Sequence, residues 1–225
     1  MVSQRSAPVD PPGSKAAILD AATDVFMHEG FSGARVDEIA RRARANKAMI
    51  YYHFGSKQGL YKATLLKLFG DVLVEIARLK ASEAEPLAKL RALYTRIAHH
   101  FTDTPALPHI MLRELLAGGK AMDAEAARTL GVIVDFVSQT VTEGVKAGKF
   151  RKVHPLLLHK TMLGPLMMHF AGASFRERVF PKGLPGGQPA GNEEMLNHLL
   201  EVLDRALAPE VLGNKIQKSR ERKTK

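Results

Sequence analysis

The 225-residue sequence contains no cysteine, which excludes disulfide bonds and thiolate metal sites. This absence fits a reducing compartment, and we expect a cytoplasmic protein. No run of about 18 apolar residues is present, so the sequence predicts no membrane span. Residues 1–13 contain proline and glycine but no long apolar run, and they do not resemble a signal peptide.

Catalytic and metal-binding motifs are also missing. No spacing among the nine histidines and the acidic residues is typical of a zinc site. His99 and His100 are adjacent and would face different directions on a helix. His159 and His169 are too far apart along their helix to share an ion. There is no G-x-S-x-G motif, P-loop or dinucleotide fingerprint. We therefore expect no metal, no cofactor and no enzymatic activity.

The net charge of +10 points towards nucleic-acid binding, but half of the excess lies at one end of the chain. The terminal stretch GNKIQKSRERKTK carries six Lys or Arg residues against a single acid, Glu221. We expect a disordered basic tail over residues 209–225. Because the rest of the chain is only mildly basic, the position of each cation is more informative than the total.

Long alternating runs of β-branched residues are absent, whereas apolar residues recur at three- and four-residue spacing. This pattern predicts an all-α protein. Ser14, Asn46 and Ser56 are suitable N-caps, and Gly30 can end the first helix. Helices are predicted over residues 15–29, 36–43, 47–54, 57–80, 86–102, 107–117, 124–147, 155–178 and 193–207.

Two short helices, 36–43 and 47–54, are joined by only Arg44-Ala45-Asn46 and follow a supporting helix. This arrangement is typical of a helix-turn-helix, whose second helix enters the DNA major groove. Ile50 and Phe54 are four residues apart and would point inward together. The outward face carries Lys47, Ala48, Met49, Tyr51, Tyr52 and His53, with Arg41, Arg42 and Arg44 just before it.

The stretch ILDAATDVFMHEGFSGARVDEIARRARANKAMIYYHFGSKQGLY resembles the N-terminal domain of the tetracycline-repressor (TetR) family. The match runs from Ser14 to Leu60. Its diagnostic pieces are Ala21-Ala22, Phe26, Gly30-Phe31, Val36–Ala40, Ile50–Phe54, Ser56-Lys57 and Leu60. The resemblance implies a transcriptional regulator with a second, helical domain for ligand binding and dimerisation.

The resemblance also implies a role for individual positions. Residues that would read bases are Asn46, Lys47, Ala48 and Met49; residues that would contact the backbone and groove are Tyr51, Tyr52, His53 and Lys57. These residue types suit the task, because tyrosine hydroxyls and lysines bind phosphate without reading sequence. Lys47 could in addition read guanine edges.

Three positions depart from the family pattern. Arg44 stands where a glycine is usual in the turn, so a left-handed backbone there would cost about 1 kcal/mol, unless the arginine is retained for a phosphate contact. Arg35 replaces a Thr or Ser, which removes a capping hydroxyl and adds a cation for DNA. Met49 replaces a usual Thr. We expect these changes to alter the operator sequence more than the fold.

The predicted domains follow from these features. Residues 1–13 form a disordered arm, 14–56 the helix-turn-helix domain, 57–80 a linking helix, 81–208 the ligand-binding and dimerisation domain, and 209–225 the tail. Gly164-Pro165 is expected to bend helix 155–178. The segment Pro181–Gly191 is too rich in glycine and proline for regular structure.

Helices 155–178 and 193–207 are apolar over broad faces, and a partner chain could cover part of that surface. Two such helices from each subunit would form a four-helix bundle about a two-fold axis, as the family resemblance implies. The alternative is that both helices belong to the core of a single chain.

An apolar cavity with a few polar groups is the usual form of a small-molecule site. The candidate lining, for a largely apolar ligand, is Phe101, His109, Met111, Arg113, Phe136, Met162, His169 and Phe170. Each of these residues could equally be ordinary core. Arg113 could hold an anionic ligand or simply pair with Glu114.

The sequence therefore predicts a ligand-responsive repressor that binds a palindromic DNA operator as a homodimer, with helix 57–80 as the lever between its two domains. Two alternatives stay open at this point. One is a non-specific DNA-binding protein driven by the basic tail, and the other is a helical interaction module without an inducer.

Overall fold

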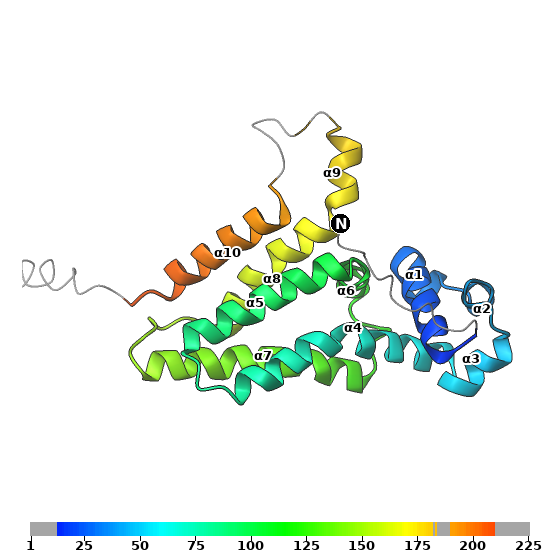
Figure 1. The fold of residues 1–225 in the computed structure, drawn as a ribbon, viewed down its shortest axis with the longest axis horizontal. Coiled ribbons are helices and arrows are strands. Elements are labelled where there is room, and N and C mark those ends of the chain that lie inside the picture. Colours follow the sequence, from blue (N-terminus) through cyan, green and yellow to red (C-terminus); the bar gives the residue numbers. More distant parts are fainter. Residues whose placement is uncertain (1–12, 182, 184–189, 210–225) are drawn as a thin grey trace, which may run out of the picture.

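The computed structural model describes residues 13–181, 183 and 190–209, and this part of the chain contains helices and no strand (Figure 1). The all-α prediction is confirmed. The helices are α1 (Lys15–Gly33), α2 (Val36–Ala43), α3 (Lys47–Phe54), α4 (Lys57–Lys80), α5 (Pro86–Asp103), α6 (Ala106–Leu116), α7 (Ala124–Lys146), α8 (Pro155–Ala171), α9 (Ala173–Val179) and α10 (Asn192–Leu207). Residues 1–12 of the predicted arm, residues 210–225 of the predicted tail and most of the predicted loop before α10 lie outside the described residues.

The first three helices form a unit at one end of the molecule, and α4 runs from this unit into the larger helical part (Figure 1). α1 packs on α2, α4 and α6, while α3 packs on α2 and α4. The shared core of the unit is fully buried at Ile18, Phe26, Ile39 and Ile50. This burial stabilises and orients α3, because a helix of only about two turns is not stable through its backbone hydrogen bonds alone.

Helices α4, α5, α7, α8 and α10 make up the larger part, with α7 packed on α4, α5 and α8. The apolar stripe of α10, from Leu196 to Leu207, is buried against α5 and α8 of the same chain. The apolar stripe of α10 is therefore part of the core of a single chain, which is the alternative to a dimer contact. Among the described helices, none combines the length and the apolar composition that a membrane-spanning segment needs.

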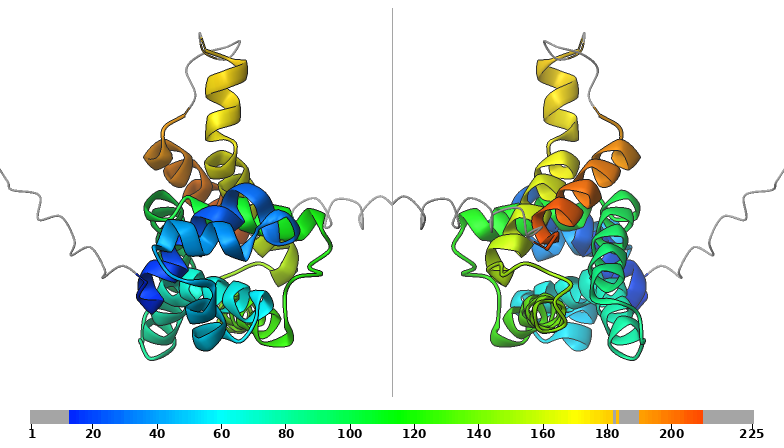
Figure 2. Two further views of the ribbon diagram at one scale, coloured as in Figure 1. Left: turned by 90° about the vertical axis from the view of Figure 1, so that its right-hand side faces the viewer. Right: turned by 90° about the vertical axis from the view of Figure 1, so that its left-hand side faces the viewer.

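The predicted helix 155–178 is in fact two helices, which is a correction to the sequence analysis. α8 continues through Pro165 and ends at Gly172, where the chain turns into α9. A Cβ atom at Gly172 would lie 2.5 Å from the carbonyl oxygen of Met168, so this close turn requires glycine. In all three views α9 rises away from the rest of the bundle (Figures 1 and 2).

Gly30 also acts as a break. Its backbone lies at φ 68° and ψ 177°, outside helical values, within the span of α1. The regular part of α1 therefore ends where the sequence predicts, and residues 31–33 form a further turn directed towards α2.

The end of α7 depends on Gly144, which the ring of Phe150 covers. A Cβ atom at this position would overlap the ring, and the amides of Lys149 and Phe150 both donate to the Gly144 carbonyl. Because Phe150 is buried, its ring has little room to move. We expect Gly144→Ala to lower the free energy of unfolding by about 1–3 kcal/mol in urea denaturation.

Gly131 is the matched control, since it lies in the same helix and no atom would meet its Cβ within 4 Å. Gly131→Ala should instead raise stability by about 0.5–1 kcal/mol, because alanine orders more readily in a helix. Equal effects of the two substitutions would contradict the packing described for Phe150.

Candidate nucleic-acid interface

The helix α3 is anchored to the core through one face, and most of its other side chains face solvent. Ile50 is its one fully buried residue, and Phe54 is half-buried with the ammonium of Lys15 above its ring. At the start of α3, the Asn46 side chain accepts a hydrogen bond of 2.8 Å from the amide of Met49. Asn46, placed among the base-reading residues by resemblance, therefore caps the helix through Oδ1.

The turn before α3 contains the one non-glycine residue with positive φ in the described part of the chain. Arg44 lies at φ 52° and ψ 40°, which is the left-handed region. Its amide donates to the Arg41 carbonyl, and the amide of Ala45 donates to the Ala40 carbonyl. This pair of hydrogen bonds is the Schellman motif, which usually has glycine where Arg44 stands.

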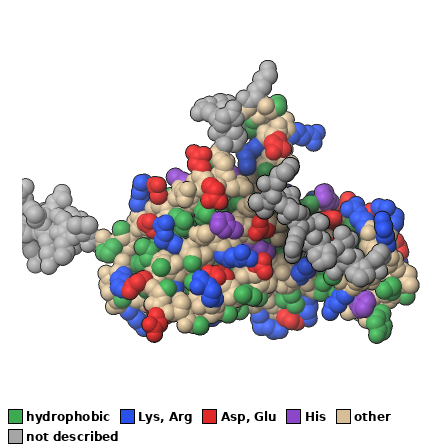
Figure 3. Space-filling model, in the orientation of Figure 1, with side chains coloured by type: hydrophobic (Ala, Val, Ile, Leu, Met, Phe, Trp, Pro, Cys, Tyr) green, Lys and Arg blue, Asp and Glu red, His purple; other side chains and the backbone are tan. Residues whose placement is uncertain are grey.

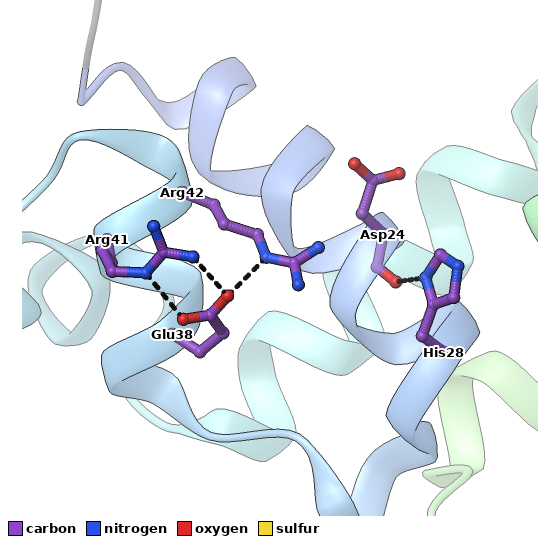
Figure 4. Close-up of polar contacts among 5 residues, drawn as sticks. All are labelled: Asp24, His28, Glu38, Arg41 and Arg42. Atoms are coloured by element: carbon purple, nitrogen blue, oxygen red, sulfur yellow. Dashed lines mark hydrogen bonds and ion pairs between the residues drawn. The ribbon is translucent and has the colours of Figure 1, made fainter.

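Acidic side chains from α2 pair with Lys47, which is predicted to contact DNA, and with Arg41 and Arg42. The Lys47 ammonium lies 3.0 Å from Oδ1 of Asp37 and donates to Oδ2 at 3.1 Å. The carboxylate of Glu38 lies between the guanidinium groups of Arg41 and Arg42 (Figure 4). These hydrogen bonds lower the pKa of Glu38 to about 2, so it stays ionised at neutral pH.

Arg35 and Arg44 form the contrasting pair, because neither guanidinium has an ion-pair or hydrogen-bond partner among the residues that the structure covers. Arg35 is the N-cap residue of α2, and its side chain makes no capping hydrogen bond, as expected where an arginine replaces the usual Thr or Ser. Both arginines are exposed. They are the cations most readily available to phosphate groups.

The aromatic residues at the end of α3 point into solvent. Tyr52 is 86% exposed and Tyr51 is 42% exposed, and the rings of Tyr52 and His53 meet edge to face. Ala48 is exposed, whereas Met49 is half-buried beside Gly13. Lys and Arg side chains lie next to acidic ones at this end of the molecule (Figure 3).

Lys57, predicted to contact the DNA backbone, lies at the start of α4 and is half-buried. Its ammonium donates to the Ser32 carbonyl at 3.4 Å and lies 4.8 Å from the centre of the Phe31 ring. Burial lowers the pKa of Lys57 from its ordinary value. A phosphate contact by Lys57 would compete with these two internal contacts.

The structure brings only part of the predicted ligand site together. Phe101 of α5 meets Phe170 of α8 edge to face, with ring centres 5.7 Å apart, and Met162 of α8 is fully buried. We call this contact region between α5 and α8 the α5–α8 seam. Phe136 on α7 is also buried, and Met111 on α6 is half-buried; both belong to the same hydrophobic core as Phe101, Met162 and Phe170.

Three predicted ligand residues make other contacts. His109 bonds the Pro105 carbonyl of its own helix, and His169 bonds Asn192 at the start of α10. Arg113 lies across the domain junction and donates to the carbonyls of Met27 and His28 at 3.1 and 2.6 Å. The neighbouring Glu114 accepts a buried 2.7 Å hydrogen bond from Tyr61 of α4 rather than pairing with Arg113.

Sequence reasoning missed a buried polar pair in the α5–α8 seam. The Tyr94 hydroxyl and Nδ1 of His159 are 3.2 Å apart, with Tyr94 completely buried. These residues are 65 positions apart, so no local pattern could reveal the contact. The acidic partners Asp37 and Glu38 were also missed, although the spacing of Glu38 from Arg41 and Arg42 is the usual one for helical ion pairs. The described residues contain no cluster of side chains able to hold a metal ion.

An exposed recognition helix, a rigid turn and flanking cations define a helix-turn-helix DNA-binding protein. A family model for bacterial regulatory proteins of the tetR family matches residues 18–64. The HTH-type transcriptional regulator RutR of Escherichia coli (strain K12) is 32% identical over 178 residues, which cover 74% of this chain and 82% of RutR. The chain belongs to the TetR family of transcriptional regulators. This membership confirms the predicted class and the prediction that the protein is not an enzyme.

Other similar proteins agree with this assignment. The HTH-type transcriptional repressor NicS of Pseudomonas putida is 34% identical over 136 residues, 60% of this chain and 64% of NicS. A putative fatty acid metabolism regulator from Clostridium perfringens has a TM-score of 0.66 at 20% identity, covering 84% of this chain and 97% of its own. FadR from Bacillus subtilis, solved with stearoyl-CoA, has a TM-score of 0.63 at 17% identity, with coverage of 86% and 99%. At these identities the two structures show a shared fold only.

The left-handed conformation of Arg44 leads to a prediction. Arg44→Gly removes a strain of about 1–2 kcal/mol, offset in part by the greater chain entropy of glycine. We expect a net rise of up to about 1 kcal/mol in the free energy of unfolding. Because a cation is lost, the slope of log K against log salt for duplex DNA should become shallower by about 0.9.

Arg44→Ala separates the two effects, since alanine loses the charge but keeps the Cβ atom. It should give the same shallower salt slope without the gain in stability. If alanine stabilised the protein as much as glycine does, backbone strain at this turn would not be the cause.

Proposed function

We propose that this protein is a homodimeric, ligand-responsive repressor that acts in the cytoplasm on a near-palindromic DNA operator. The observation that carries the proposal is the outward face of α3, held by the buried Ile50 and flanked by Arg35 and Arg44, which have no ion-pair partner among the described residues. Residues 14–56 would act as the DNA-binding domain, and residues 81–208 as the domain that binds ligand and partner. Tyr51, Tyr52 and His53 would contact the DNA backbone, while Lys47, Ala48 and Met49 face the bases.

The proposed dimer is supported by one face of α8. Leu157, Thr161, Gly164 and Met168 are spaced by four, three and four residues, so they share a helix face. Leu157 is 60% exposed and Met168 is 63% exposed. Gly164 between them has open space around its Cβ position. An exposed apolar face with small residues at its centre suits close packing against the same face of a second copy.

This proposal is tested by selecting duplexes from a random-sequence pool with the wild-type protein. We expect an inverted repeat whose half-sites are separated by about 34–36 Å, one turn of DNA, or a multiple of it. Leu157→Asp should convert the dimer to a monomer in light scattering and should abolish the preference for the inverted repeat. The loss follows because a charge would enter the apolar contact.

Val74→Asp is the control, since Val74 is 70% exposed on α4, which lies on the opposite side of the body from α8 and α10 (Figure 1). It should keep both the dimer and the inverted repeat. Enrichment of single half-sites by the wild-type protein would contradict the proposed mode of binding, and a wild-type monomer would contradict the dimer.

The proposed ligand site is the α5–α8 seam, where Met162 lies on α8 between His159, which contacts Tyr94, and Phe170, which contacts Phe101. Tyr94 is completely buried, so its hydroxyl needs an acceptor, and His159 Nδ1 is the one at hand. Burial lowers the pKa of His159, which favours the neutral imidazole, and its proton must then be on Nε2. An N–H donor on Nε2 would suit a largely apolar ligand with an acceptor oxygen.

Contacts across the junction support a route from this site to the DNA. α6 packs on α8 and also on α1, where Arg113 donates to the carbonyls of Met27 and His28. Tyr61 and Glu114 join α4 to α6 by a buried hydrogen bond. A ligand that shifts α8 would therefore move elements attached to both α1 and α4, and a coupling of about 1–3 kcal/mol would change DNA affinity roughly 5–150-fold.

The chain has no tryptophan, so one introduced into the seam can act both as a filler and as a reporter. Met162→Trp places a large ring where the ligand would lie, at an overpacking cost of about 1–3 kcal/mol. We expect blue-shifted emission from a buried ring and a change of at least about five-fold in affinity for the selected inverted repeat. Fluorescence anisotropy of labelled duplex measures this affinity.

Leu203→Trp on α10 is the matched control, because Leu203 is also completely buried. It should reduce stability to a similar extent and leave DNA affinity unchanged. An unaltered affinity in a folded Met162→Trp protein would contradict a ligand site in the seam without affecting the proposal for α3.

A further inference from the structure

The ion pair between Asp37 and Lys47 joins the two helices of the helix-turn-helix. Asp37 lies in the first turn of α2, and Lys47 is the first residue of α3. Both carboxylate oxygens are close to the ammonium, at 3.0 and 3.1 Å, although the two residues are ten positions apart. The side chains keep 49% (Lys47) and 73% (Asp37) of their surface exposed.

An ion pair this exposed adds little to the stability of the fold, because water screens it. Its larger effect is on the charge that the protein presents to DNA. Phosphate groups attract every free cation without regard to sequence. Asp37 cancels the charge of Lys47 and fixes its ammonium at the start of the recognition helix, while an ammonium keeps further N–H donors for a base edge.

The geometry points to Asp37 as a specificity-determining residue: it positions Lys47 for base contacts and suppresses sequence-independent binding to phosphates. This role refines the operator binding proposed above, and it rests on that proposal where the affinities for specific and random DNA are compared. The negative charge of Asp37 repels phosphates and so weakens binding to every DNA sequence. Because Asp37 holds Lys47 at the start of the recognition helix, this loss of binding free energy is smallest on a sequence whose base edge accepts a hydrogen bond from the ammonium.

A second acidic residue on α2 also pairs with cations of the helix-turn-helix. Glu38 binds Arg41 and Arg42, so that two acids offset three cations of this unit. Arg35 and Arg44 have no such partner among the described residues and remain to anchor the phosphates. The cations are thereby divided into restrained and unrestrained groups.

The test is Asp37→Asn, which keeps the shape of the side chain and removes its charge. Binding is measured against salt for a random-sequence duplex and for the inverted repeat selected by the wild-type protein. On the random duplex we expect affinity to rise about two- to five-fold at low salt. The slope of log K against log salt should steepen by about 0.9, because one more cation releases a counterion. The ratio of specific to non-specific affinity should fall.

Asp20→Asn is the matched control. Asp20 pairs with Lys67 between α1 and α4, so the same charge is removed from an exposed Asp–Lys pair away from α3. It should leave the salt slope and the affinity ratio unchanged. An equal steepening with Asp20→Asn would overturn the proposal, since net charge alone would then explain the effect.

The double variant Asp37→Asn with Lys47→Met decides whether Asp37 acts through Lys47. Compared with Lys47→Met alone, the double variant should show no further steepening of the salt slope. A full effect of Asp37→Asn in the absence of Lys47 would overturn the positioning role. If the wild-type protein selected no inverted repeat, operator binding would fail as a proposal, whereas the slopes on the random duplex would still decide whether Asp37 restrains Lys47.

Discussion

The burial of Ile50 is the contact on which the DNA-facing surface depends. An eight-residue helix is far below the length of about 12–15 residues at which an isolated helix becomes marginally stable in water. α3 exists because Ile50 enters the core made by α1, α2 and α4, and because Asn46 caps its first turn. Every other side chain of α3 is left at least partly exposed, which is what a surface that reads DNA needs.

Around this helix, stability and function make opposite demands on the same positions. Arg44 occupies a left-handed turn where glycine would be more favourable, and Arg35 occupies an N-cap where a hydroxyl would be. Both give up local stability and place next to the recognition helix a cation that has no partner in the described part of the chain. Strain that persists at such positions is typical of functional sites.

In the larger part of the chain, the apolar residues of α8 serve two different surfaces. One face, with Met162 and Leu166, is buried in the bundle, whereas the face with Leu157 and Met168 stays in solvent. A helix that is apolar nearly all round is unfavourable in a monomer. The polar contacts made by α6 towards α1 and α4 then connect this bundle to the DNA-binding unit.

Local sequence signals were enough to predict most of the helices, the turn and the family, because caps, glycine breaks and helical periodicity act over a few residues. Ser14, Asn46 and Ser56 cap the helices at which they are predicted, and Gly30 leaves helical geometry as expected. Local signals could not predict which side chains distant in the sequence meet in the fold. The pairing of Tyr94 with His159, of Lys47 with Asp37 and of Arg113 with α1 depends on how whole helices pack. The break at Gly172 and the burial of α10 within its own chain have the same origin, since both follow from close approach between elements and not from local preference.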